Sequence, residues 1–233
     1  MGCIGSQPAT PGPPFTHWRT LIDGSPTRGF PIRDTTSVVD AFARVDPVLL
    51  HAMSWANELG VAAVGPGAGS TLRLLAAAAR AGNVVEIGTG TGVSGLWLLA
   101  GMRAGGVLTT IDIEPEHQAM ARQSFAAAGH ASTRTRLIAG SAVDVLARLA
   151  DLAYDLVFVD GDPLDHAACV GAAHRLLREG GLLVVNHALP DPTADDLDSR
   201  VLRELVAYVR DAPEWTPTLV PTGTGLLCAT KAV

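Results

Sequence analysis

Residues 84–95 read VVEIGTGTGVSG, in which a short apolar run passes into a glycine-rich turn and then into a second apolar segment. Glycine tolerates backbone conformations with positive φ, and its lack of a side chain lets a ligand lie directly on the main chain. A strand, a glycine-rich turn and a helix in this order bind nucleotide-like cofactors in many α/β proteins. The stretch therefore predicts an α/β fold with a cofactor at the turn.

Short apolar runs alternate with helix-length segments around and beyond this stretch. Such runs, apolar on both faces, are typical of a parallel sheet covered by helices on both sides. The runs are residues 83–87, 107–111, 136–139, 155–159 and 182–186. Two further strands, 216–220 and 225–230, follow a helix at about 197–210, and the short turn between them makes them antiparallel. We predict a Rossmann-like, mostly parallel sheet of seven strands with an antiparallel C-terminal hairpin and helices on both faces.

Helices are also predicted before the first strand. Apolar residues recur at helical spacing over residues 38–57, where Pro47 starts a second helix and Gly60 ends it. Residues 65–69 predict a break, and residues 71–81 predict a third helix. These helices belong to the same domain as the sheet.

Two regions divide the chain. Residues 1–35 are rich in proline and show little periodicity, so we expect a flexible N-terminal arm there. Residues 36–233 then form one domain of ordinary size.

The composition excludes several classes of protein. Of the 233 residues, 48% are hydrophobic and 17% are charged, which supports a large buried core. The formal net charge of −6 argues against nucleic acid or an anionic membrane as partners, since both require clustered cations. No apolar run is long enough to span a membrane, and three scattered cysteines suit a reducing compartment. We therefore expect a cytoplasmic protein.

Two acidic residues narrow the choice of cofactor. Glu86 lies inside the first strand, where a charge is costly unless a ligand uses it. Asp112 ends the second strand, where its carboxylate can accept hydrogen bonds from ribose hydroxyls of either NAD or S-adenosylmethionine. A dinucleotide fingerprint starting directly after the strand would begin at Gly88 and place its third glycine at Val93. The glycine register therefore argues against a dinucleotide.

Four motifs follow one another in a characteristic order: VVEIGTGTG (84–92), TIDIE (110–114), RLIAGSA (136–142) and YDLVFVDGD (154–162). They resemble those of the class I S-adenosylmethionine-dependent methyltransferases, and within them the cation-dependent O-methyltransferases related to catechol and caffeoyl-CoA methyltransferases. The match is closest to a group of actinobacterial O-methyltransferases and covers about residues 38–232. The resemblance implies methyl transfer to a hydroxyl of a small acceptor such as a phenol, by a homodimer.

The resemblance also implies positions that bind the cofactor. Those on the methionine and ribose side come from the first strand and its turn, with one residue in the preceding loop. Asp112 would bind the ribose, Ile113 would pack on the adenine, and Ala142 would lie beside the ring. The complete set is Val64, Glu86, Gly88, Thr89, Gly90, Ser94, Asp112, Ile113, Ala142, Asp160 and Asp162.

The chain departs from the family at the expected metal site. The usual pattern holds a divalent cation with the acid at Asp160 and an Asp-Asn pair after the fifth strand, and a lysine follows the second acid. Here the pair is Asn186 and His187, and the lysine position is Pro163. Loss of a carboxylate puts Mg²⁺ in doubt, because this hard ion prefers charged oxygen ligands. Asp160, Asn186 and His187 remain the candidate ligands of a weaker site or of a transition metal.

His187 is our candidate general base, because imidazole titrates near neutral pH and His187 would lie beside Asp160. The alternative, that His187 only caps the strand, stays open. Asp165 and His166 begin the next helix and could also reach the pocket.

Two alternative functions stay open. A NAD(P)-dependent oxidoreductase has no Tyr-x-x-x-Lys set to support it. A catalytically decayed S-adenosylmethionine-binding protein with an interaction role remains possible because of the altered metal site.

Overall fold

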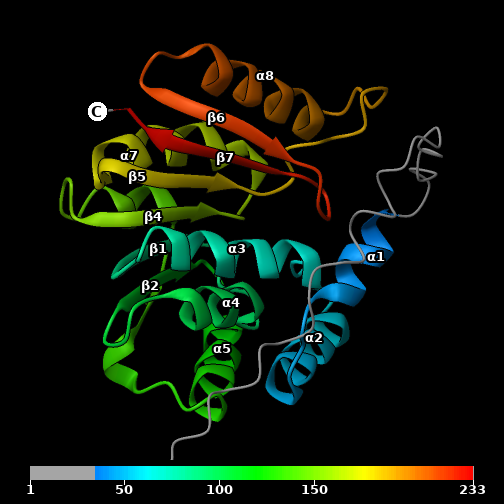
Figure 1. Ribbon diagram of the computed structural model, residues 1–233, viewed down its shortest axis with the longest axis vertical. Coiled ribbons are helices and arrows are strands. Elements are labelled where there is room, and N and C mark those ends of the chain that lie inside the picture. Colours follow the sequence, from blue (N-terminus) through cyan, green and yellow to red (C-terminus); the bar gives the residue numbers. More distant parts are fainter. Residues whose placement is uncertain (1–34, 233) are drawn as a thin grey trace, which may run out of the picture. The chain divides into compact units, whose positions relative to one another are not determined.

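The computed structural model describes residues 35–232, and the predicted arm lies outside the described residues except for Thr35. A seven-stranded sheet has the order β3-β2-β1-β4-β5-β7-β6 (Figure 1). The first five strands are parallel, and β7 pairs antiparallel with both β5 and β6. The strands are β1 (Asn83–Ile87), β2 (Val107–Asp112), β3 (Thr135–Ala139), β4 (Tyr154–Val159), β5 (Leu177–Val185), β6 (Trp215–Val220) and β7 (Leu226–Lys231). The predicted fold class is confirmed.

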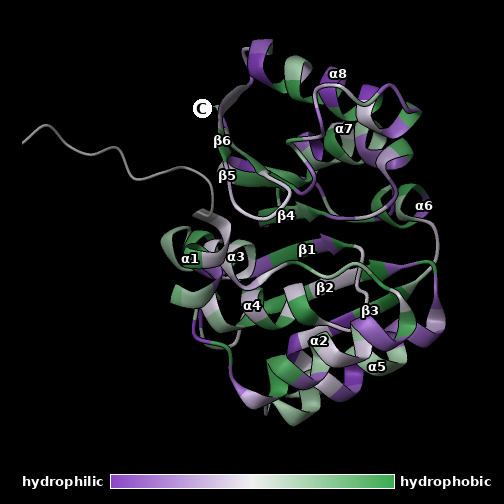
Figure 2. Ribbon diagram, turned by 90° about the vertical axis from the view of Figure 1, so that its right-hand side faces the viewer, coloured by the Kyte–Doolittle hydropathy of each residue, from purple (hydrophilic) through white to green (hydrophobic). Residues whose placement is uncertain are grey.

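Eight α-helices are described within residues 35–232. They are α1 (Thr35–Phe42), α2 (Pro47–Leu59), α3 (Pro66–Ala78), α4 (Val93–Gly101), α5 (Pro115–Ala127), α6 (Ala142–Leu146), α7 (His166–Leu176) and α8 (Leu197–Asp211). In Figure 2 the helices carry both green hydrophobic and purple hydrophilic positions, as amphipathic helices that cover a sheet do. None of the described helices is long and apolar enough to cross a lipid bilayer.

The sheet separates two hydrophobic cores, because successive side chains of a strand point to opposite faces. Val84 and Leu156 pack with helices α2 to α5 on one face, whereas Val85 and Val157 pack with α6 to α8 on the other. All four side chains are fully buried. Strands buried on both faces explain the continuous apolar runs in the sequence.

Two predicted boundaries are wrong. Helix α3 begins at Pro66 and runs through the predicted break at 65–69. Proline suits the first turn of a helix, and the Gly67 N–H donates to Asp40 Oδ1 at 2.7 Å, so the helix start is satisfied despite its glycines. Strand β5 begins at Leu177, five residues before the predicted start, because a register shift against β4 accommodates the polar residues 178–181.

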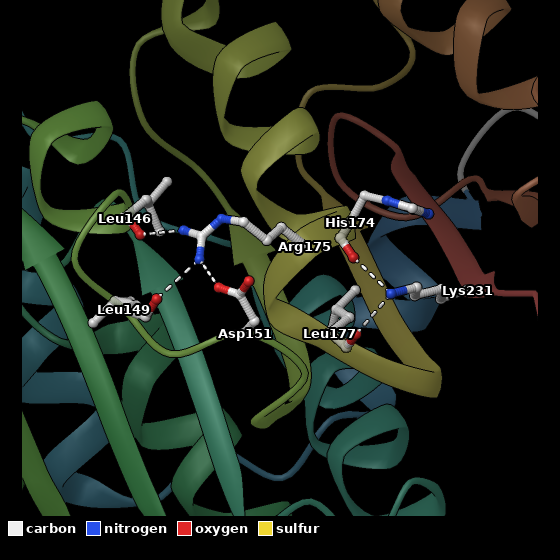
Figure 3. A network of polar contacts seen from close by, with 7 residues as sticks. All are labelled: Leu146, Leu149, Asp151, His174, Arg175, Leu177 and Lys231. Atoms are coloured by element: carbon white, nitrogen blue, oxygen red, sulfur yellow. Dashed lines mark hydrogen bonds and ion pairs between the residues drawn. The ribbon is translucent and has the colours of Figure 1, made fainter.

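Two basic side chains fix the ends of helices at the edge of the sheet opposite the carboxyl ends of its parallel strands (Figure 3). Arg175 donates to the main-chain carbonyls of Leu146 at 2.7 Å and Leu149 at 3.0 Å, and it also pairs with Asp151. Lys231 Nζ donates to the carbonyls of His174 at 2.8 Å and Leu177 at 3.0 Å. These cations bind main-chain carbonyls where α6 and α7 end, a position at which positive charge is favourable. Lys231 is the only lysine in the sequence, and it serves the fold.

Candidate active site

The carboxyl ends of the parallel strands meet at one edge of the sheet, where main-chain hydrogen bonds continue past the strand ends. These bonds run from Gly88 N to Ile111 O (2.9 Å), from Asp160 N to Ile87 O (2.8 Å), from Asn186 N to Val159 O (2.9 Å) and from Gly140 N to Asp112 O (2.9 Å). The loops that follow β1, β3, β4 and β5 are therefore held in register with the ends of the neighbouring strands. A cavity of about 450 Å³ opens among them.

The glycine-rich turn forms one wall of this cavity. Gly88 and Gly92 have φ of 92° and 91°, which side chains other than glycine rarely adopt. A Cβ on Gly88 would also collide with the main-chain carbonyl of Asp160. The sequence therefore needs glycine at this point both for the turn and for the close approach of the loop after β4.

Asp112 is held in a fixed orientation at the end of β2. Its Oδ2 accepts from the Gly90 N–H and its Oδ1 from the Glu114 N–H, both at 2.9 Å. His117 Nδ1 lies 3.4 Å from Oδ1. A carboxylate oriented in this way keeps free lone pairs that can accept from a diol.

Glu86 is fully buried behind the cavity wall, and neither carboxylate oxygen has a hydrogen-bond partner among the described residues. Burial raises the pKa of Glu86 to about 7. The nearby hydroxyls of Thr110 and Ser94 favour the ionised form without forming a hydrogen bond of acceptable geometry, and the charges of Asp160 and Asp112 oppose it. A cation bound in the cavity would stabilise the Glu86 carboxylate.

Asp160, Asn186 and His187 form a polar cluster where β4 and β5 end. The Asn186 amide donates from Nδ2 to Asp160 Oδ1 at 2.8 Å, and His187 Nε2 lies 3.4 Å from the same oxygen. The interaction with Asp160 raises the pKa of His187, against an opposing effect of burial. His187 has φ of 58°, a conformation uncommon outside glycine, asparagine, aspartate and histidine. Such backbone strain is typical of functional sites.

His166, at the start of α7, adds a second imidazole to the cavity wall. It is fully buried, its Nε2 lies 3.1 Å from the Gly161 carbonyl, and its Nδ1 has no partner among the described residues. Burial lowers the pKa of His166, so the ring is neutral at pH 7. Cys169 lines the wall one turn later, and burial raises the pKa of its thiol to about 12, which keeps it unreactive.

The structure brings most of the predicted site residues to this single cavity. Of the eleven predicted cofactor positions, ten line it, and only Glu86 lies behind the wall. Asp160 and His187 also line the cavity, whereas Asn186 is buried and does not. Ile113 lies on the rim, with 69% of its surface exposed, and Asp162 is exposed and caps Leu164 N.

Other lining residues carry little signal in the sequence. Residues 61–63 reach the cavity from the loop before α3, and His117 reaches it from the first turn of α5. The signal that indicates His117 is its place in the first helical turn after β2, because cofactors bind at the carboxyl ends of parallel strands.

The cluster does not fit Mg²⁺. Asn186 turns its N–H₂ group, a donor, towards the Asp160 carboxylate, and a hard cation requires oxygen ligands. Across residues 35–232, no three His, Cys, Asp or Glu side chains are arranged to hold a metal ion.

Comparisons with known proteins point to one family. Residues 48–230 match the family model described as O-methyltransferase. A Mycobacterium tuberculosis protein whose name assigns it to the O-methyltransferases is 50% identical over 191 residues, which cover 80% of this chain and 85% of that protein.

Solved structures agree. A Corynebacterium glutamicum protein is 34% identical with a TM-score of 0.78, covering 84% of this chain and 95% of its own. The O-methyltransferase TomG of Streptomyces achromogenes, involved in tomaymycin synthesis and solved with S-adenosylmethionine, is 27% identical with a TM-score of 0.75 and the same coverage. An O-methyltransferase of Bacillus cereus, solved with S-adenosylhomocysteine, is 25% identical with a TM-score of 0.73, again with that coverage.

Proposed function

Because this chain belongs to the O-methyltransferase family, we propose that it transfers the methyl group of S-adenosylmethionine to a hydroxyl of a small acceptor. The observation that carries the proposal is the acidic cavity at the strand ends, with the oriented Asp112 carboxylate and the unpartnered Glu86 behind its wall. None of the described residues that line the cavity is Lys or Arg. Such a cavity suits a ligand that carries a sulfonium and an ammonium group. The bound ligands of the S. achromogenes and B. cereus relatives support the same choice.

We assign the parts of the cofactor to parts of the cavity. The methionine portion is assigned to the turn at Gly88 and Gly90, which lines the cavity, with the Glu86 carboxyl group buried behind it. The ribose hydroxyls are assigned to Asp112, whose carboxylate accepts from the Gly90 N–H. We assign the remaining positions, Val64, Thr89, Ser94, Ile113, Ala142, Asp160 and Asp162, to the same ligand on the basis of the resemblance and their place in the cavity wall.

The bound cofactor supplies a methyl group on a positively charged sulfur, which an oxygen nucleophile displaces in line. The chain must remove the proton of the acceptor hydroxyl, and we assign this to His187. An Nε2–H that faces Asp160 leaves the lone pair of Nδ1 to take the proton. The proposed step uses no divalent cation, because the residues of the cluster do not fit one.

The proposed base favours a phenol as acceptor. A phenol has a pKa near 10 and an imidazole titrates near neutral pH, so the imidazole can take the phenol's proton as the methyl group is transferred. An aliphatic alcohol is far less acidic and is a poorer match for this base. The cavity is also acidic, which disfavours an anionic acceptor.

A direct experiment tests the proposed function. Calorimetric titration should show binding of S-adenosylhomocysteine and none of NAD, and labelled S-adenosylmethionine should methylate members of a panel of phenols. Asp112→Asn should weaken S-adenosylhomocysteine binding about tenfold or more, because it removes a charge-assisted acceptor. Glu116→Gln, an exposed change on α5, serves as the matched control. Cofactor binding without transfer to any acceptor would instead favour a decayed enzyme with an interaction role.

We also propose that the chain forms a homodimer through α1 and α2. Phe42 is 87% exposed and Val38 is 69% exposed, and Leu50 on α2 is exposed as well. Apolar side chains of this size on adjacent helices are typical of an interaction surface.

A further inference from the structure

Hydrogen bonds hold both ends of the Asn186 side chain, and the Asp160 carboxylate, which can only accept, sets the orientation of the amide. Its Nδ2 donates to Asp160 Oδ1 at 2.8 Å, and its Oδ1 accepts from the hydroxyl of Thr224 at 3.3 Å. Thr224 lies in the turn between β6 and β7, which main-chain bonds from Ala188 N to Gly225 O and from Leu189 N to Thr224 O tie to the loop after β5. With 5% of its surface exposed, Asn186 has little space to turn over.

This arrangement is the opposite of what a metal ligand requires. A cation placed beside Asp160 would face the hydrogens of the amide, and turning the amide to offer its oxygen would break its hydrogen bond to the Asp160 carboxylate. The amide instead satisfies Asp160 Oδ1 directly. The next residue in the chain, His187, also lies close to Asp160 Oδ1, with its Nε2 at 3.4 Å.

We infer that Asn186 is a positioning residue that takes the place of a divalent cation, and that the methyl transfer of this chain needs no added metal. The amide holds the Asp160 carboxylate in the orientation that His187 requires. The functional half of this inference rests on the proposed methyl transfer, whereas the half that concerns metal binding does not.

The charge of the side chain at position 186 decides whether the cluster needs a cation. A carboxylate at this position would lie within hydrogen-bond distance of Asp160, and two like charges at that separation repel unless a cation or a proton lies between them. Asn186→Asp should therefore create the need for a cation that the natural chain lacks. Thr224, which holds the amide, is not altered by this change.

Metal binding is measured first, on the full chain. Titration with Mn²⁺, followed by the electron paramagnetic resonance signal of the free ion, should show no site in the natural chain at up to millimolar Mn²⁺. Asn186→Asp and Asn186→Asp/His187→Asn should each gain one site, which Asp160→Asn then abolishes. A stoichiometric site in the natural chain that Asp160→Asn removes would overturn the inference, and so would folded variants that gain none. The natural-chain titration needs no variant, so it decides even if the variants fail to fold.

Activity is measured second, with a phenol that the natural chain methylates. Chelator should leave the turnover of the natural chain unchanged. Asn186→Asp should lose about 10- to 100-fold in kcat without metal, as expected for loss of a hydrogen bond to a charged group, and regain activity with Mg²⁺ or Mn²⁺. A merely structural role for Asn186 predicts no such rescue. Loss of natural activity with chelator and its return with Mg²⁺ would contradict the inference, whereas absence of transfer under all conditions would count against the proposed function and leave the Mn²⁺ result to decide.

Discussion

Glu86 has the most unusual surroundings of the acidic residues in the site. It is fully buried without a hydrogen-bond partner among the described residues, and its pKa is raised from 4.5 to about 7. In the absence of cofactor, the folded protein therefore binds a proton that the unfolded chain has already released between these two pH values. By proton linkage, this group makes the fold less stable as the pH rises from 4.5 to 7.

Glu86→Gln should remove this pH dependence. The natural chain should lose about 3 kcal/mol of unfolding free energy from this group between pH 4.5 and 7, since each pKa unit corresponds to about 1.4 kcal/mol. Urea denaturation of both proteins at pH 5 and pH 8 measures the difference. Equal pH dependence in the two proteins would show that Glu86 does not titrate as its burial indicates. Glu116→Gln, at an exposed position of α5, controls for the loss of a surface carboxylate.

His187 should control the acidic limb of the pH–rate profile. Its pKa is raised by the hydrogen bond to Asp160, and a general base must be neutral, so kcat/KM should increase with pH through that raised pKa and then level off. His187→Ala should lower kcat about 100-fold or more and remove this limb. Asp160→Asn should move the limb to lower pH, because the stabilising carboxylate is gone. A profile unchanged in His187→Ala would refute the assignment.

For single residues, the sequence predicted which side chains lie at the strand ends, but it did not predict which of them contact one another. Asp112 and Asp160 could be placed because both follow apolar strands of a parallel sheet, whose carboxyl ends share an edge. The bond between the Asn186 amide and Asp160 could not be predicted, since it depends on a hydroxyl that comes 38 residues later. The lack of a hydrogen-bond partner for His166 Nδ1 among the described residues could not be predicted either, because it depends on how the fold buries this ring.

The secondary-structure elements were predictable where hydrophobic pattern and turn residues agree. Strand β1 occupies the predicted residues 83–87, and Pro47 and Gly60 bound α2 as expected. The start of α3 was missed because Gly67 and Gly69 are poor helix formers, and tertiary contacts explain both. The Gly67 N–H is taken by Asp40, and a side chain on Gly69 would collide with the indole of Trp97.

Lys231 stabilises the C-terminal end of α7, and no local sequence pattern indicates this role. Lys231→Met should lower the free energy of unfolding by about 2 kcal/mol, because it removes two hydrogen bonds to the carbonyls of His174 and Leu177 and leaves them without this partner. Lys231→Arg should restore part of the loss. Chemical denaturation measures both variants, and methyl transfer well below the melting temperature should be unchanged, because Lys231 lies at the end of β7 remote from Asn186. A loss of activity without a loss of stability would contradict this structural role.

For the domain as a whole, the class of the sheet and its C-terminal hairpin were predictable, whereas the order of the strands was established by the structure. The periodicity of the sequence distinguishes parallel runs from a hairpin, but it does not specify that β7 inserts between β5 and β6. Residues 48–230 form the part that the family model matches. The exposed apolar residues Val38 and Phe42 of α1 and Leu50 of α2 are among the large apolar side chains that the described fold does not bury.

The proposed dimer makes a prediction at this scale. Phe42→Asp places a charge on a side chain that is 87% exposed in the single chain, so it should leave the fold stable but shift a dimer to a monomer. Light scattering coupled to gel filtration measures the mass, and Leu219→Asp, an exposed change on β6, is the matched control. A natural chain that elutes as a monomer would refute the dimer outright.

The hairpin of β6 and β7 has a consequence for how the protein is made. Thr224 at its turn is the last part of the Asp160 cluster to be synthesised, and β7 is the partner that covers the edge of β5. On the ribosome, the glycine-rich turn and Asp112 are therefore synthesised before the hairpin. Until β7 is made, the edge of β5 has no partner and can associate with other strands. Synthesis that stops before the hairpin would leave β5 without its antiparallel partner and Asn186 without the threonine that holds its amide, so the proposed active site is complete only once the last strand has been made.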